Sequence, residues 1–359
     1  MRTAVAERSG DTALEFVHRS GVRKPRGASL PAAVQNGVRW FKAPTHFQVL
    51  EVALSPSGDE GDVAMPARSE GWLLMTGDLL YNEPGIRLVC TLGVFTLMAV
   101  LEGRHPRRKR SFPRRQRWPN NLGVTLLDAL LARIVLPTSA IGLAVIAESY
   151  RLGFFNRADL PAWLEIVGAI ILLDLAIYGQ HVLFHYVPML WRFHRMHHAD
   201  LDLDVTTGTR FHPVEILLSF GIKFVVVGAV GASPLSVLIF EVLLNATSLF
   251  NHSNLRLPRG LEWLLRCFVV TPDMHRVHHS ILSRETNSNF GFNLPWWDRL
   301  FRTYRAQPEA GHDGMTLGLD RFRDPEELRL GRMLTQPFRD DGSNSSEGNE
   351  RPIQPRGQV

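Results

Sequence analysis

One stretch of the chain joins a membrane-span pattern to a pair of histidines: residues 161–185 read PAWLEIVGAIILLDLAIYGQHVLFH. The run from Pro161 to Tyr178 is almost entirely apolar, and about 20 such residues form a helix that crosses a bilayer. Asp174, Tyr178, His181 and His185 occupy positions i, i+4, i+7 and i+11, which share one helical face. The stretch predicts a transmembrane helix that carries imidazoles at one end.

Most of the histidines lie in or after this stretch. Of 14 histidines, ten fall between positions 181 and 279, and eight of these form clusters spaced H-x-x-x-H, H-x-x-H-H and H-x-x-H-H. On a helix, residues three and four positions apart share a face, so we expect each triplet to aim its three imidazoles at one point. Imidazole is the commonest metal-ligating side chain. The ten candidate ligands are His181, His185, His194, His197, His198, His212, His252, His275, His278 and His279.

Ten histidines exceed what one metal ion needs. About four to six ligands saturate a first-row ion, so the clusters predict two ions. Imidazole alone does not distinguish zinc, copper, iron or nickel, but two iron ions can activate O2, whereas zinc has no redox chemistry. His212 and His252 stand outside the clusters, where a histidine is more often structural, yet both lie at the ends of apolar segments.

Asp174 has two possible roles in this scheme. Because it shares a helical face with His181, its carboxylate could bind an inner histidine and fix the tautomer of the ring. Alternatively, it forms an ion pair with Arg133 inside the helical bundle. The sequence leaves both interpretations open.

Four further apolar segments flank the histidine-bearing stretch. Leu88–Leu101 is short for a full span and fits a tilted span or a re-entrant piece, whereas Asn121–Ala147 is long enough to cross. The latter contains Asp128 and Arg133, which we expect to face the bundle interior rather than lipid. The last two segments, Val214–Ala232 and Leu235–Phe250, are joined by a turn signal at 231–234, GASP, and predict a helical hairpin.

The charge pattern orients these segments. Residues 104–117 carry eight Arg or Lys and no acid, and such a juxtamembrane block marks the cytoplasmic side. The chain then leaves through 121–147, returns through 161–180, and leaves and returns again through the hairpin, so all ten histidines meet at the cytoplasmic face. We therefore expect an all-α, multi-pass transmembrane bundle with a helical cap at the cytoplasmic face that holds a histidine-rich dimetal site.

The amino-acid composition limits the type of metal site, the acidic partners and the cellular location that we expect for this protein. The only cysteines, Cys90 and Cys267, exclude C-x-x-C zinc ribbons and Fe–S clusters. The basic balance suits membrane headgroups, because no nucleic-acid-binding motif accompanies it, and we expect no nucleic acid partner. Of the 40 basic residues only four are Lys, which points to a GC-rich bacterial genome and hence to a bacterial inner membrane.

We expect three parts along the chain. Residues 1–80 show no core-forming pattern and are predicted to be disordered, or to be an extension upstream of the true start, with translation beginning at Met65 or Met75. The membrane-embedded domain covers 85–335. A polar tail, predicted to be disordered, covers 336–359.

Segments between and after the histidine clusters complete a family pattern. They read DVTT at 204–207 within DLDVTT, RFHPVE at 210–215 and NFGFNLPWWDRLF at 289–301. Together with the clusters, they resemble the sterol desaturase / fatty acid hydroxylase superfamily over about 85–335. The resemblance implies an integral-membrane, non-haem di-iron enzyme that uses O2 and external electrons on lipids. It implies the eight clustered histidines as iron ligands, His252 as an additional one, and a separate electron-donor protein, since no fused haem-binding domain is evident.

The function expected from these features is O2-dependent hydroxylation or desaturation of a lipid, whether sterol, fatty-acyl, sphingoid or ether lipid. One alternative is a non-catalytic membrane transporter or store for zinc, which would place ionisable ligands along a path within the spans. Another is a soluble metallohydrolase, whose site usually includes carboxylate ligands and which would not explain the apolar segments.

Overall fold

A computed structural model describes residues 79–80 and 82–339 of the chain. The predicted N-terminal extension lies almost wholly outside these residues, as does all of the predicted tail except 336–339. Within the described part every regular element is a helix and no β-strand forms. The all-α prediction is therefore confirmed.

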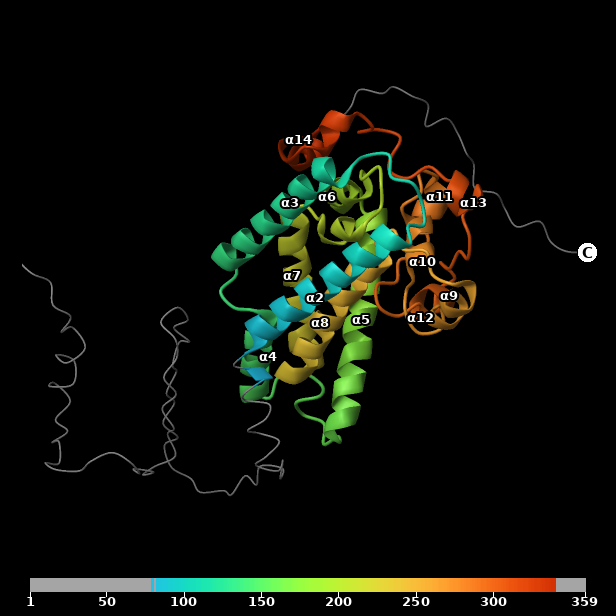
Figure 1. Ribbon diagram of the computed structural model, residues 1–359. Helices are drawn as coiled ribbons and strands as arrows, with labels where there is room; N and C mark the ends of the chain where they lie inside the picture. The colour runs from blue at the N-terminus through green and yellow to red at the C-terminus, as the bar shows by residue number, and fades with distance from the viewer. Residues whose placement is uncertain (1–78, 81, 340–359) are drawn as a thin grey trace, which may run out of the picture. The chain divides into compact units, whose positions relative to one another are not determined.

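Five helical segments are long and apolar enough to cross a membrane (Figure 1). The first segment, α2, extends well beyond the predicted Leu88–Leu101, so it has the length of a full span rather than of a re-entrant piece. The chain is a multi-pass membrane protein. The five segments are α2 (Glu83–Arg104), α3 with α4 (Arg114–Val135 and Ala140–Ser149), α5 (Ala162–Tyr186), α7 (Pro213–Val230) and α8 (Pro234–Asn251).

The predicted span 121–147 is not one continuous helix. It breaks after Val135, because Pro137 disfavours helical backbone at Leu136, whose ψ is 129°. Ser139 then caps α4 by accepting a hydrogen bond from the Gly142 amide. Arg133 sits in the last turn before this break and is exposed, so the prediction that it faces the interior is wrong, whereas Asp128 is buried as expected.

The predicted hairpin of α7 and α8 is present, and its turn is tied to α5. Gly231 ends α7 with φ at 69°, a left-handed conformation that favours glycine. Ser233 caps α8 through the Ser236 amide. The carboxylate of Glu165, near the start of α5, accepts hydrogen bonds from the amide and hydroxyl of Ser233 and from the hydroxyl of Ser236.

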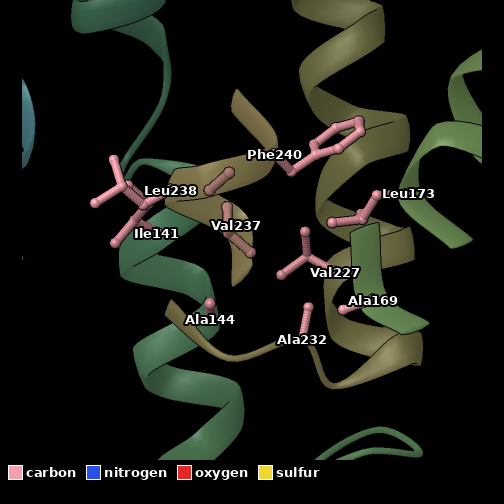
Figure 2. Close-up of a cluster of buried hydrophobic side chains, with 10 residues drawn as sticks. Ile141, Ala144, Ala169, Leu173, Val227, Ala232, Val237, Leu238 and Phe240 are labelled. Atoms are coloured by element: carbon pink, nitrogen blue, oxygen red, sulfur yellow. The ribbon is translucent and has the colours of Figure 1, made fainter. Parts of the chain in front are cut away.

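The largest apolar core lies where α4, α5, α7 and α8 meet (Figure 2). Ala144 and Ala169 place only a methyl group between neighbouring backbones, which lets the helices approach closely. Larger side chains fill the space between them: Ile141, Leu173, Val227, Val237 and Phe240 are all buried.

At the other end of the bundle, shorter helices gather where α5 ends, α7 begins and α8 ends (Figure 1). They form a helical cap over these span ends. Its elements are α6 (Pro188–His198), η2 (Val205–Thr209), α9 (Arg259–Leu265), α10 (Pro272–His278), α11 (Ser283–Thr286), α12 (Trp296–Leu300), α13 (Gly311–Gly314), η3 (Pro325–Leu328), α14 (Leu330–Thr335) and η4 (Gln336–Phe338).

Candidate metal centre

Nine of the ten candidate histidines come together in two groups. Within each group, one possible ligand atom per residue lies within 4.8 Å of those of all the others. Eight of the nine are buried, and His185 is partly buried. The larger group contains His181, His185, His194, His198 and His278, and the smaller contains His197, His252, His275 and His279.

Three helices and one helix end supply these side chains. The last turns of α5 carry the first pair, α6 carries the second cluster, α10 with its C-cap carries the third, and His252 caps the C-terminus of α8. The start of α10 is fixed by Thr271, whose hydroxyl accepts from the Met274 amide, and by Pro272 at the first helical position.

Neither triplet aims its three rings at one point, and that prediction is wrong. His194 and His198 belong to the larger group and His197 to the smaller, while His275 and His279 belong to the smaller and His278 to the larger. In both helices the residues four apart stay together, and the one at i+3 turns to the other group. Each triplet therefore serves both groups and places them side by side, with the rings of His198 and His279 stacked at 4.5 Å.

Most of the rings use Nδ1 to bind an acceptor outside the groups. A carbonyl oxygen can only accept, so these bonds place the ring proton on Nδ1 and leave the Nε2 lone pair free. This is the usual outer arrangement of a metal-ligating histidine. The bonds run from His181 to Phe290 O (2.8 Å), from His197 to Arg210 O (3.1 Å), from His252 to Ser248 O (2.7 Å) and from His278 to Ser288 O (2.8 Å).

The inner nitrogens then face one another. In the smaller group, the Nε2 atoms of His197 and His252 are 3.1 Å apart. In the larger group, those of His181 and His194 are 3.2 Å apart. All four of these rings bind an outer acceptor through Nδ1. Two lone pairs at this distance repel rather than hydrogen-bond. A shared cation removes the conflict, because adjacent nitrogens bound at about 2.1 Å to one ion lie roughly 3.0–3.4 Å from each other. The residues present thus fit a pair of metal ions.

The rings outside the spans are held neutral. Burial, with neighbouring imidazoles contributing, lowers the pKa of His278 to about 3. Burial also lowers the pKa of His252 to about 4, and those of His197, His198 and His275 well below the usual value. Neutral imidazole is the form that binds a metal.

Glu215 is a functional residue that the sequence analysis did not assign. Its carboxylate accepts a 2.7 Å hydrogen bond from Nδ1 of His194, and both residues are buried. It supplies the carboxylate partner for which Asp174 was considered. The signal was present in the sequence, because Glu215 is an acidic residue in the first turn of an apolar span, three positions after His212.

Asp174 and His212 lie beside the two groups. Within the described chain, the Asp174 carboxylate binds the amides of Asn293 and Leu294 and the indole of Trp297 rather than a histidine. It thereby anchors the loop whose Phe290 carbonyl accepts from His181. His212 caps α7: its Nδ1 accepts from the Val214 amide at 3.2 Å, and its Nε2 donates to Leu334 O at 3.3 Å.

The segment after the second cluster is held by a buried charge network. Arg117 donates to the carboxylates of Asp200 (2.6 Å) and Asp204 (2.5 Å), and Arg210 lies 3.5 Å from Asp200. Burial opposes ionisation of Asp200, but the guanidinium groups of Arg117 and Arg210 outweigh it and lower its pKa. This network positions the Arg210 carbonyl against His197, and Gly208 lets the segment pass the Ser248 carbonyl closely.

Comparison with known proteins places this centre in a family. The fatty acid hydroxylase family matches residues 166–303, which contain all nine grouped histidines. Ornithine lipid hydroxylase OlsE of Rhizobium tropici is 29% identical over 227 residues, 61% of this chain and 67% of that protein. Alkylglycerol monooxygenase of Xenopus tropicalis is 28% identical over 210 residues, 56% of this chain and 45% of that protein.

A third relative, cholesterol 25-hydroxylase of Rattus norvegicus, is 30% identical over 149 residues, 41% of this chain and 48% of that protein. The chain thus spans about half the length of the last two relatives. No solved structure matches it. The family match, these relatives and the paired histidine groups together identify residues 166–303 as a fatty acid hydroxylase domain of the sterol desaturase / fatty acid hydroxylase superfamily.

Proposed function

We propose that this protein is a membrane-bound di-iron oxidoreductase that uses O2 to hydroxylate a lipid. The observation that carries the proposal is the pair of histidine groups, whose inner nitrogens converge while the outer nitrogens are tied to the protein. The names of the relatives support hydroxylation over desaturation, since each is a hydroxylase or a monooxygenase acting on a lipid.

The nine grouped histidines would hold the two irons, which when bound supply the reductive activation of O2 needed to break an unactivated C–H bond. The protein itself positions the imidazole rings and excludes bulk water from the centre. Carbonyl groups and Glu215 fix the tautomer and direction of the rings. Burial of the rings keeps bulk water from the centre and keeps the imidazoles neutral.

The position of the histidine centre at the ends of the spans suggests how a lipid substrate and an electron donor reach it. Because the histidines sit where α5 ends and α8 ends, a lipid could reach them sideways from the bilayer. We infer that electrons come from a separate donor protein. The basic segment 104–117 lies at the same end of the spans, which supports a bacterial inner membrane protein with its centre facing the cytoplasm.

The transporter alternative has little support. A transport path would place ligands at several depths within the spans, whereas the histidines here gather at one end and are held by outer hydrogen bonds. The relatives reported above are named as hydroxylases or monooxygenases.

Purification from iron-supplied cells tests the proposal. We expect about two irons per chain, and O2-dependent addition of one oxygen atom to a lipid in a panel that includes ornithine lipids, alkylglycerols and sterols. His278→Ala should abolish the oxidation, and His105→Ala, at an exposed position outside both groups, should not. Fully active protein that contains zinc instead of iron would refute the di-iron assignment.

A further inference from the structure

Two short helices of the cap expose large apolar side chains next to each other. Trp263 in α9 is 73% exposed, Phe268 just after α9 is 61% exposed, and Leu300 in α12 is 66% exposed. Trp296 and Phe301 are also exposed. We call these five residues the α9–α12 patch.

The two helices form one unit. The indole of Trp296 donates to the Cys267 carbonyl at 2.8 Å, and Arg299 donates to the Arg266 carbonyl at 2.6 Å. The Val270 amide donates to the Asn293 carbonyl at 2.9 Å. This bond joins the segment after α9 to the segment before α12. The exposed side chains of the two helices are therefore held in a fixed arrangement.

This unit is fastened to a membrane span. Trp297, which faces inward from α12, donates to Asp174 at 2.8 Å, and the ring of Phe301 stacks on Tyr178 at 5.4 Å. Both anchor residues belong to α5, and Figure 1 shows α12 beside that helix.

The anchor points lie at membrane depth. At about 1.5 Å per residue, Asp174 and Tyr178 lie roughly 18 and 24 Å from the start of α5, within a hydrocarbon core about 30 Å thick. Exposed Trp163 marks the opposite interface, where tryptophan is enriched. At this depth, side chains of α12 that point away from α5 would meet lipid rather than water.

Charged residues at the edge of the patch agree with this placement. Arg259, Arg299 and Arg302 are exposed around the apolar side chains. Short helices with aromatic residues on one side and arginines nearby are typical of segments that lie in the bilayer interface. The guanidinium groups of Arg259 and Arg302 can reach lipid phosphates while the aromatic rings stay in the acyl region.

We propose that α9 and α12 lie in the plane of the bilayer and insert the α9–α12 patch into the leaflet nearest the histidines. The occupant of this surface is the phospholipid leaflet itself. The segment that leads into α12 also carries Phe290, whose ring packs on His181 at 5.6 Å. Membrane insertion of the patch thus sets the depth of the histidine centre relative to the lipids, whatever metal the centre holds.

The chain provides its own probe. Cys267 is exposed within this unit, and Cys90→Ala leaves it as the only cysteine without changing the patch. The full-length protein is spin-labelled at Cys267 and placed in nanodiscs of phosphatidylcholine and phosphatidylglycerol. Collisions of the label with O2, which concentrates in lipid, and with a water-soluble nickel chelate are then compared.

Two references calibrate the measurement, each in a cysteine-free background: Val167→Cys on the exposed side of α5 and Asp320→Cys in the cap, whose carboxylate is 77% exposed. We expect Cys267 to match Val167→Cys, with nickel collisions several-fold below those of Asp320→Cys. Leu300→Cys should agree. A nickel-accessible label at Cys267 or at Leu300→Cys would place the patch in water and overturn the proposal. A label shielded from both probes would show that protein covers the patch, and would overturn it equally.

Discussion

At the scale of single residues, the two nitrogens of most imidazoles in the centre have different roles. Nδ1 donates outward to a carbonyl or a carboxylate, and Nε2 points inward. Because these outer partners are fixed in α7, in α8 and in the loop after α11, the directions of these lone pairs are set before a metal arrives. Outer partners should therefore matter for metal affinity nearly as much as the ligands do.

Glu215→Gln tests this dependence. The amide keeps the size of the side chain but removes the negative charge that faces His194. We expect iron affinity to fall by about 10–100-fold, as is typical when an outer partner is lost, with the protein still folded in the membrane. The measurement is retention of iron against a graded chelator. Glu326→Gln, at an exposed site in η3, is the matched control, and equal retention by the two variants would argue against the role of Glu215.

His312 makes the stability of the cap depend on pH. Burial lowers its pKa to about 4, against the opposing effect of Asp273 at 3.6 Å and with a contribution from Arg276 and Arg107. Since the unfolded chain binds this proton near pH 6.5 and the folded chain only near pH 4, stability due to this group is complete above pH 6.5 and falls as pH drops towards 4.

His312→Gln, which has no such proton to bind, should therefore lose less thermal stability than the unmodified chain between pH 6.5 and 4. Thermal midpoints at several pH values, measured for both proteins in the same detergent, give the comparison. Parallel curves for the two proteins would show that His312 does not titrate in this way.

At the scale of elements, apolar runs predicted the spans and the GASP turn predicted the hairpin, because both signals are local. The break at Leu136 was also local but was missed, since apolar content outweighed the signal of Pro137. The division of each histidine triplet between two groups could not be read from spacing. A helix fixes which residues share a face, but the neighbouring helices decide which ring joins which group.

The turn between α7 and α8 packs closely against the segment after α4, and a substitution at Gly231 tests this packing. A Cβ at Gly231 would lie 2.7 Å from the Leu152 carbonyl oxygen, and the residue has φ of 69°. Gly231→Ala should therefore lower stability by at least about 1–3 kcal/mol, the usual cost of a strained backbone conformation. Gly221→Ala, in the middle of the same helix with nothing within 4 Å of its Cβ, should be neutral or slightly stabilising. Equal thermal midpoints for the two variants would show that the turn relaxes.

At the scale of the whole molecule, three features meet at one end of the spans. The histidine groups, the buried network around Arg117 and the basic segment 104–117 all lie where α2 ends, α3 begins and α5 ends. The opposite end carries the α4–α5 connection and the hairpin turn. We propose from this polarity that the centre faces the cytoplasm, because basic segments beside membrane spans favour the cytoplasmic side.

Site-specific labelling checks that orientation. In a background without Cys90 and Cys267, a cysteine is placed at Asp320, in the cap, or at Asp159, exposed in the α4–α5 connection. A membrane-impermeant maleimide, applied to bacterial cells whose outer membrane has been removed, should label Asp159→Cys and spare Asp320→Cys until the inner membrane is opened. The reverse pattern would place the histidines on the outer side. Electrons would then have to come from a donor outside the cytoplasm, although the ligand geometry would stand unchanged.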